Sequence, residues 1–227
     1  DIELSVVTGF GKEQVESYLG DAFSHLSLTF AFQQKRKGTA DALRTYFEKI
    51  ESAQHRDYTL IMCADTPLLE SETLLSLYRV LKGHGGDAVC ASFHTPTPQG
   101  YGRIQRSARG FSIIEEKDAD SEQKQIQEVN SGLYMMKTSY IRKHLNQIDD
   151  KNASGEFYLT DLFSPERNVK ALAFQDGKTF QGVNDLEQLE TVETEIRRRK
   201  VQSLMQKGVR FMDRRHCYID DTVEIAE

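Results

Sequence analysis

Apolar and polar positions alternate between two kinds of spacing in the first part of the chain. Short apolar runs predict β-strands at residues 2–8, 26–32, 58–64 and 87–93. Between them, helical spacing predicts helices at residues 12–19, 39–50 and 70–81. The run YTLIMCA at residues 58–64 is almost continuous, which is typical of a strand buried on both faces. This alternation predicts an α/β fold with a mostly parallel sheet and helices on both sides.

The second part of the chain has a different pattern. Apolar runs at residues 102–106 and 110–115 flank the turn signal Ala108-Arg109-Gly110, which predicts a hairpin, and further strands are expected at residues 128–136 and 169–174. Residues 185–206 predict one long polar helix. The short apolar steps that follow, at residues 209–225, are too few for a solenoid, which needs about three repeats. We interpret them as the cut end of a second domain.

Composition excludes several classes of protein. The 227 residues suit one large α/β domain, and 38% apolar with 28% charged residues argue against disorder. The net charge of -6 disfavours a nucleic-acid partner. No apolar stretch approaches the roughly 20 residues of a membrane helix. The cysteines Cys63, Cys90 and Cys217 form no C-x-x-C pair, so we expect buried free thiols in a reducing cytoplasm.

Three kinds of catalytic site have no signature in the sequence. The six histidines show no metal-ligand spacing, and no G-x-S-x-G elbow, G-x-G-x-x-G fingerprint or Walker loop occurs. These absences disfavour zinc chemistry, nucleophilic hydrolysis and dinucleotide binding.

Two positions suggest a nucleotide and a metal. Asp65 follows the apolar run at residues 58–64, and ligands of open α/β sheets bind beyond the carboxyl ends of strands. A carboxylate there can hold Mg²⁺ through oxygen, or it can simply cap the next helix. Gly38 and Thr39 open a helix, where a glycine admits a ligand close to the backbone; an ordinary N-cap is the alternative.

Other polar residues stand where strands begin or end. Gly102, in Gly100-Tyr101-Gly102-Arg103, suits a turn that contacts a flat ligand, or a plain tight turn. Glu115 and Glu116 are adjacent on a strand, so at most one of them reaches a given pocket. Asn130 and Asn184 each follow a valine on a predicted strand or at its end, where they act on a ligand or form local turn bonds.

Seven motifs stand in one order along the chain. They are Gln33-x-x-x-x-Gly38-Thr39-Ala40, Ala64-Asp65-Thr66-Pro67-Leu68-Leu69, Gly100-Tyr101-Gly102-Arg103-Ile104, Ile114-Glu115-Glu116-Lys117-Asp118-Ala119, Glu128-Val129-Asn130-Ser131-Gly132, Gly155-Glu156-Phe157-Tyr158-Leu159-Thr160-Asp161 and Gly182-Val183-Asn184-Asp185. From about residue 4 to its end, the chain therefore resembles the uridylyltransferase domain of the bifunctional N-acetylglucosamine-1-phosphate uridyltransferase/glucosamine-1-phosphate acetyltransferase.

The resemblance implies a Rossmann-like nucleotidyltransferase fold, with a mixed, mostly parallel sheet flanked by helices. Residues 1–184 would be the nucleotidyltransferase domain without its first strand and glycine-rich loop. Residues 185–208 would be a linker helix, and residues 209–227 the stub of a left-handed β-helix that starts the acetyltransferase domain.

Site residues follow from the same resemblance. Uracil and nucleotide would be held by Gln33, Gly38 and Thr39, and Mg²⁺ by Asp65 and Asn184. The N-acetylglucosamine pocket would be lined by Gly102, Glu115, Asn130, Tyr158 and Thr160. No catalytic residue is assigned, because the family's arginine and lysine belong to the segment before residue 1. The loop Lys35-Arg36-Lys37 is unusually basic and either contacts phosphates or is solvated.

The implied reaction transfers UMP from UTP to N-acetylglucosamine-1-phosphate, giving UDP-N-acetylglucosamine and pyrophosphate. It would take place in the cytoplasm and supply precursors of peptidoglycan and lipopolysaccharide. Full-length members of the family form homotrimers, and the sequence leaves open whether this fragment is a monomer. Two alternatives remain: a non-catalytic truncated relative that binds sugar nucleotide or a protein partner, and a transferase for another sugar phosphate.

Overall fold

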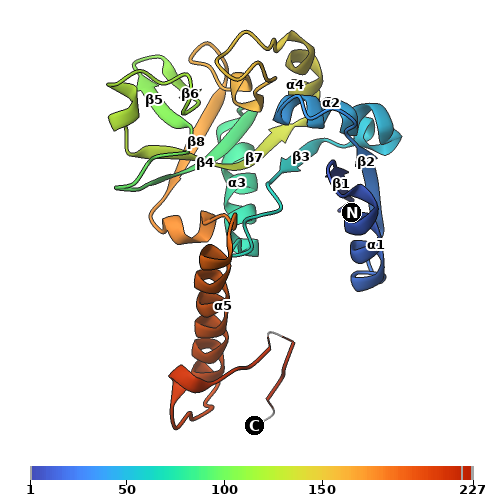
Figure 1. Cartoon of the computed structure of the whole chain (residues 1–227). Helices are drawn as coiled ribbons and strands as arrows, with labels where there is room; N and C mark the ends of the chain where they lie inside the picture. The colour runs from blue at the N-terminus through green and yellow to red at the C-terminus, as the bar shows by residue number, and fades with distance from the viewer. Residues whose placement is uncertain (1, 221, 226–227) are drawn as a thin grey trace. The chain divides into compact units, whose positions relative to one another are not determined.

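The computed structural model describes residues 2–220 and 222–225 (Figure 1). Its strands are β1 (Leu4–Thr8), β2 (Leu28–Phe32), β3 (Tyr58–Ile61), β4 (Ala88–His94), β5 (Arg103–Ser107), β6 (Gly110–Ile114), β7 (Glu128–Lys137) and β8 (Val169–Phe174). Its α-helices are α1 (Lys12–Ala22), α2 (Thr39–Lys49), α3 (Ser71–His84), α4 (Thr138–His144) and α5 (Leu186–Gln206). Short 3₁₀ turns are η1 (Glu51–His55), η2 (Gln123–Gln125), η3 (Leu145–Gln147), η4 (Leu159–Leu162), η5 (Gly177–Phe180) and η6 (Arg214–His216). The strands and helices predicted from the sequence up to residue 206 are confirmed, most with small shifts of their ends.

The chain divides into two compact units, and the first contains Asp1–Met62 and Ser76–Gln175. This unit holds a parallel pair, β1 and β2, and a six-stranded sheet in the order β6-β5-β7-β4-β8, with β3 also paired to β7. One edge of β7 carries two partners in succession: Val129 faces Arg103 of β5, and Tyr134 faces Ile61 of β3. The other edge pairs with β4. The long strand β7 therefore joins the hairpin β5–β6 to the rest of the sheet (Figure 1).

The sheet is mixed, as predicted, but it is not mostly parallel. In the six-stranded sheet only β4 and β8 pair in parallel, while the pairings of β7 with β3, β4 and β5 and of β5 with β6 are antiparallel. A helix between two strands does make them run in the same direction here. β3 and β4, which α3 separates along the chain, are both antiparallel to β7 and therefore share one direction. The periodicity could not show that β7 is inserted between them.

One apolar core lies in the first unit. It is built from buried side chains such as Leu43 and Phe47 of α2, Met136 of β7 and Ile141 of α4. The buried residues of α2 are spaced for one helix face, which explains why this segment forms an amphipathic helix against the sheet. The core fixes the start of α2 relative to β7 and η4, and most of the predicted site residues lie around this region.

The strand predicted at residues 58–64 is shorter and less buried than expected. β3 ends at Ile61, and the Thr66 hydroxyl donates a hydrogen bond to the Cys63 carbonyl at 3.0 Å, which closes a turn. Met62 is 48% exposed, and Cys63 is exposed rather than buried. Cys90 in β4 is buried as predicted, whereas Cys217 is partly exposed. The hydrogen bond that closes this turn comes from Thr66, outside the apolar run, so the run itself does not indicate where the strand ends. The predicted strand therefore extended three residues beyond Ile61.

The second unit contains Cys63–Leu75 and Asp176–Glu227. Its main element, α5, begins after Asp185, whose carboxylate accepts a hydrogen bond from the Gln188 N–H at 2.8 Å and so caps the helix. The described residues after α5 form only the short turn η6 and contain no strand, so no β-helix is evident. The apolar steps at residues 209–220 and 222–225 therefore form no solenoid turn, a structure that needs about three stacked repeats to bury a core. Within the described ranges, no helix is long and apolar enough to cross a bilayer.

Candidate functional site

Three residues assigned to the sugar pocket meet where β5, β6 and β7 come together. The Asn130 N–H donates to the Gly102 carbonyl at 2.8 Å. A Cβ placed on Gly102 would lie 3.1 Å from Cγ2 of Ile113 and 3.5 Å from Oε2 of Glu115. Gly102 is therefore needed for close packing beside the carboxylate of Glu115. The hairpin and β7 bring Gly102, Glu115 and Asn130 into one cluster.

Glu115 is the acid that faces this cluster. Its Oε1 accepts a hydrogen bond from the Thr160 hydroxyl at 2.7 Å, and its burial raises the pKa of the carboxyl above the usual range. Glu116 points to the other side, where it pairs with the buried Arg103 at 2.6 Å. That hydrogen bond lowers the pKa of Glu116. The two adjacent acids therefore have different partners, and the assignment of Glu115 to a sugar pocket stays a prediction.

Asn130 is held by local bonds. Its Nδ2 donates to the Tyr134 hydroxyl at 2.6 Å, and its Oδ1 accepts from the Gly132 N–H at 3.3 Å. These bonds span an irregular stretch of β7, where the register against β4 shifts between Cys90 and Ser92. The local-bond alternative therefore describes the side chain of Asn130, which shapes the strand beside Gly102.

A loop connects the sugar cluster to the start of α2. Gly38 has φ +104°, and a Cβ there would lie 2.6 Å from the Phe157 carbonyl oxygen. The Phe157 N–H donates to the Lys37 carbonyl at 2.8 Å, and the Phe157 carbonyl accepts from the Ala40 N–H at 3.0 Å. The close approach that requires a glycine at this position is therefore made by the chain's own backbone.

Gly38 is the N-cap residue of α2, in line with the N-cap alternative, while the side chain of Thr39 bonds elsewhere. Its hydroxyl oxygen accepts a hydrogen bond from the Leu159 N–H at 3.1 Å, and the N-cap residue Gly38 has no side chain. This bond lies between Tyr158 and Thr160, both assigned to the sugar pocket. The pKa of the Tyr158 hydroxyl is raised, mainly by burial. The structure thus brings Gly38 and Thr39 next to the segment that carries Tyr158 and Thr160.

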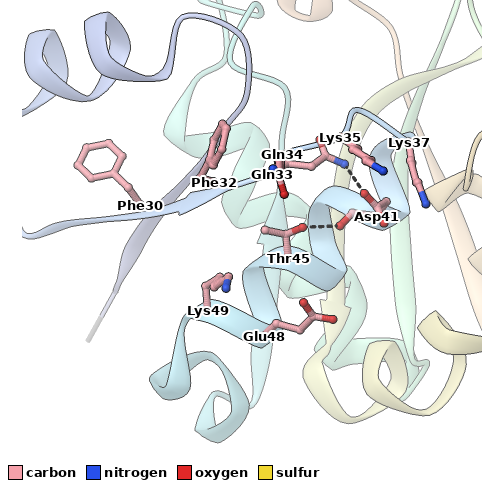
Figure 2. Close-up of a pocket in the computed structure, with 10 residues that line it drawn as sticks. All are labelled: Phe30, Phe32, Gln33, Gln34, Lys35, Lys37, Asp41, Thr45, Glu48 and Lys49. Atoms are coloured by element: carbon pink, nitrogen blue, oxygen red, sulfur yellow. Dashed lines mark hydrogen bonds between the residues drawn. The ribbon is translucent and has the colours of Figure 1, made fainter.

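Gln33 lines a cavity of about 670 Å³ beside the start of α2. Figure 2 shows its side-chain amide directed toward Asp41, with a hydrogen bond of 2.7 Å from Nε2 to Oδ2 of Asp41. Lys35, Lys37 and Lys49 line the same cavity, so the basic loop faces it rather than solvent alone. An open cavity with an amide and several ammonium groups can hold a planar base and anionic phosphates.

The two predicted metal ligands both belong to the second unit. The Asp65 carbonyl accepts a hydrogen bond from the Val183 N–H at 2.9 Å, which holds Asp65 next to the segment that precedes Asn184. Asp65 lies in a turn beyond the end of β3, and within the described residues its carboxylate caps no helix and accepts no hydrogen bond. Nδ2 of Asn184 donates to Oε1 of Gln188 at 3.3 Å, which leaves Oδ1 for another partner.

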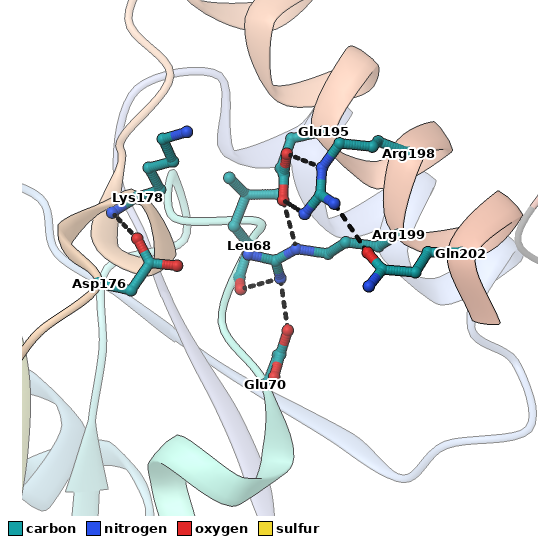
Figure 3. Close-up of polar contacts among 8 residues, drawn as sticks. All are labelled: Leu68, Glu70, Asp176, Lys178, Glu195, Arg198, Arg199 and Gln202. Atoms are coloured by element: carbon teal, nitrogen blue, oxygen red, sulfur yellow. Dashed lines mark hydrogen bonds and ion pairs between the residues drawn. The ribbon is translucent and has the colours of Figure 1, made fainter. Parts of the chain in front are cut away.

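An arginine of α5 fastens the loop that follows Asp65. Figure 3 shows the Arg199 guanidinium between this loop and its own helix, with hydrogen bonds to the Leu68 carbonyl at 3.0 Å, Glu70 at 2.7 Å and Glu195 at 3.0 Å. Hydrogen bonds from Arg198 and Arg199 lower the pKa of Glu195 to about 2. Several charges in one network hold their geometry better than an isolated surface pair. Arg199 thereby limits the movement of the loop that begins at Asp65.

Comparison with known proteins shows the family. A family model described as nucleotidyl transferase matches residues 2–179. The chain belongs to the nucleotidyl transferase family.

Two curated relatives, both called bifunctional protein GlmU, cover almost the whole chain. The identity is 36% over 229 residues for the protein of Caldanaerobacter subterraneus and 33% over 225 residues for that of Thermosipho africanus. Each comparison covers 99% of this nucleotidyl transferase chain and 48% of the relative. The chain thus spans about half the length of these relatives.

Solved structures show the same fold at low identity. An Entamoeba histolytica protein described as a UDP-N-acetylglucosamine pyrophosphorylase has a TM-score of 0.70 at 12% identity, over 91% of this chain and 68% of that one. A Bacillus anthracis protein described as a glucose-1-phosphate thymidylyltransferase has a TM-score of 0.61 at 15% identity, over 92% and 78%. At these identities the comparison establishes the α/β nucleotidyltransferase fold and nothing finer.

Two residues that contact candidate site residues or their loops were not predicted from the sequence. Asp41 bonds Gln33 across eight positions, but Gln33 follows β2 and Asp41 lies in α2, so no single periodic pattern links them. Arg199 belongs to the segment predicted as one long polar helix, yet its side chain bonds the Leu68 carbonyl, 131 positions away. A motif search finds residues that share a segment, but these two act on segments that only the fold brings near.

We expect Glu115→Gln to raise the free energy of unfolding at neutral pH. Because burial raises the pKa of Glu115, the folded chain holds this proton more tightly than the unfolded chain. Stability is therefore lost as pH rises from the ordinary glutamate pKa of about 4.3 toward the folded value. Glutamine removes this loss and still accepts the Thr160 hydrogen bond. Urea unfolding at pH 4 and pH 7 measures the difference, which should appear mainly at pH 7.

The adjacent residue provides a control of opposite sign. The lowered pKa of Glu116 means that its carboxylate adds stability above the ordinary pKa, which is lost as pH falls through the folded value. Glu116→Gln should therefore destabilise the chain at pH 7. A loss of stability at pH 7 in Glu115→Gln would contradict the assigned pKa direction.

Proposed function

We propose that this chain transfers UMP from UTP to N-acetylglucosamine-1-phosphate, giving UDP-N-acetylglucosamine and pyrophosphate. One observation carries the proposal: the segment of residues 157–160 is bonded to both candidate subsites. On the nucleotide side Leu159 bonds Thr39, and on the sugar side Thr160 bonds Glu115. A segment tied at both ends keeps two bound substrates at a fixed separation, and such positioning is a major part of the catalysis of group transfer.

The residues of the first unit have distinct tasks in this reaction. The sugar-phosphate oxygen attacks the α-phosphorus of UTP in line while pyrophosphate leaves, so the protein mainly positions groups and neutralises charge. Gln33 would accept a hydrogen bond from the base, and Lys35 and Lys37 would pair with phosphate oxygens. Glu115 and Thr160 would bind the sugar hydroxyls beside Gly102.

Asp65 and Asn184 would hold Mg²⁺. A carboxylate and an amide oxygen are the hard donors that this ion takes from proteins, with waters and phosphates as its other ligands. In the described part of the chain no three His, Cys, Asp or Glu side chains gather into a metal site. When bound, Mg²⁺ neutralises charge on the phosphates.

The wider setting belongs to the same proposal. Residues 1–184 would be the nucleotidyltransferase domain, residues 185–208 its linker helix and residues 209–227 the start of a β-helix acetyltransferase domain that is completed, and forms trimers, only in a longer protein. The reaction would be cytoplasmic and would serve peptidoglycan and lipopolysaccharide synthesis. These points rest on the likeness to the bifunctional relatives.

The direct test measures pyrophosphate release from UTP and Mg²⁺ with either N-acetylglucosamine-1-phosphate or glucose-1-phosphate as acceptor. Turnover with the first and little with the second supports the proposal. Preference for glucose-1-phosphate would assign another sugar. Binding of UDP-N-acetylglucosamine without turnover would instead support a non-catalytic binding module.

A further inference from the structure

The amide of Gln33 is held in one orientation by two acceptors. Its Nε2 donates to Oδ2 of Asp41 at 2.7 Å and to the Gly38 carbonyl at 3.3 Å (Figure 2). A primary amide has two N–H donors, so both are used within the protein. Over the described residues, no group donates to Oε1 of Gln33, which therefore remains the free end of the amide in the cavity.

This orientation is required by the chemistry of the partners. The oxygen and nitrogen of a glutamine amide are assigned from their hydrogen bonds, because their positions alone are nearly equivalent. Here one partner is a carboxylate and the other a carbonyl, and neither can donate a proton to an amide oxygen. A flipped amide would face Oε1 against the carboxylate of Asp41, with the loss of a short, charge-assisted bond.

Asp41 is itself held in place by its helix. It lies in the first turn of α2, where a carboxylate interacts favourably with the helix dipole. Gln33 is anchored from the other side, because its N–H donates to the Thr8 carbonyl at 2.8 Å and extends the pairing of β1 with β2. The carboxylate of Asp41 and the backbone hydrogen bond of Gln33 together restrict the Gln33 amide to one position.

We propose that Asp41 is a specificity-determining residue, which makes Gln33 a pure acceptor and so selects a base with a ring N–H. The proposal rests on the proposed function, since it assumes that the base of the nucleotide meets Gln33. Uracil and cytosine have nearly the same shape, but N3 of uracil donates a proton whereas N3 of cytosine accepts one. An acceptor fixed opposite this position bonds uracil and repels cytosine. Asp41 touches no substrate in this scheme and acts through Gln33.

Replacing Asp41 by asparagine should relax the selection. The asparagine amide can donate to Oε1 of Gln33, so the Gln33 amide can turn and present its N–H groups to the base. One good base contact discriminates by a factor of roughly ten or more. The ratio of the dissociation constants for CMP and UMP should therefore fall about tenfold in Asp41→Asn, mainly through tighter CMP and weaker UMP binding.

Nuclear magnetic resonance titration of the ¹⁵N-labelled chain with UMP and with CMP tests this. The same spectra show the side-chain N–H pair of Gln33, which is assigned from its disappearance in Gln33→Glu. Glu48→Gln is the matched control, because the substitution removes the same charge from the same cavity. Glu48 has no hydrogen bond to Gln33 in the described part of the chain. In Asp41→Asn the Gln33 pair should shift toward the position of a free amide, and in Glu48→Gln it should stay.

The outcomes separate this inference from the proposed function. A reduced CMP/UMP ratio in Asp41→Asn alone, with the shift of the Gln33 resonances, supports the role of Asp41. An unchanged ratio in Asp41→Asn, when the original chain prefers UMP, overturns that role and leaves the uridine site in place. If the original chain binds neither nucleotide, or binds both equally, the assignment of a uridine site at Gln33 is wrong. The proposed role of Asp41 is then refuted as well, because it depends on that site.

Discussion

Gly38→Ala is expected to destabilise the chain by about 3 kcal/mol or more and to disrupt the segment that joins the two candidate subsites. Two costs add at this position. The φ of +104° is unfavourable for any residue with a Cβ, at about 1–3 kcal/mol. The new Cβ would also lie 2.6 Å from the oxygen and 2.9 Å from the nitrogen of Phe157, which adds about 1–3 kcal/mol of overpacking. Both atoms are backbone, so they cannot move aside without breaking their bonds to Lys37 and Ala40.

Urea unfolding measures the loss, and the chain supplies a matched control. Gly155 also has a positive φ, +64°, but a Cβ there would meet no atom within 4 Å. Gly155→Ala therefore bears the backbone strain without the collision and should cost about 1 kcal/mol. Equal losses of unfolding free energy in the two variants would show that the collision with Phe157 contributes nothing to the destabilisation.

The elements of the fold were largely predictable, because local spacing reports which residues face a core. β8 has the predicted bounds, and the hairpin of β5 and β6 follows from its turn residues. What local spacing could not give is adjacency. The antiparallel insertion of β7 between β3 and β4 depends on contacts between distant segments, and so the sheet was wrongly expected to be mostly parallel.

The members of the site were more predictable than their individual roles. The motif order led to Gly102, Glu115 and Thr160, which the fold does bring together. Their neighbours act differently from the simplest expectation. Gly38 makes room for the backbone of Phe157, and the amide of Asn130 is engaged by Tyr134 and Gly132. A sequence shows that a small or polar residue is needed, but only the packing shows which partner requires it.

Asp65→Ala is expected to abolish the effect of Mg²⁺ on nucleotide binding while leaving the fold intact. Across the described residues the Asp65 carboxylate has no hydrogen-bond partner, and it is exposed, so removing it breaks no protein contact. The bond that matters for the loop, from the Val183 N–H to the Asp65 carbonyl, belongs to the backbone and is retained in alanine. The unfolding free energy should therefore change by about 0.5 kcal/mol or less.

The loss of metal binding has a separate cause. Mg²⁺ binds proteins through one or two carboxylates, and an amide oxygen without a charged partner holds it weakly. Asn184 alone should thus fail to retain the ion, and calorimetric titration with UTP should show at least about a tenfold loss of the Mg²⁺-dependent affinity. Glu70→Gln is the control, because it removes a carboxylate of the same loop that pairs with Arg199 and is not one of the proposed metal ligands. If Asp65→Ala kept its Mg²⁺-dependent binding, the metal would have to be held elsewhere, whereas a loss shared by Glu70→Gln would point to the general charge of the loop.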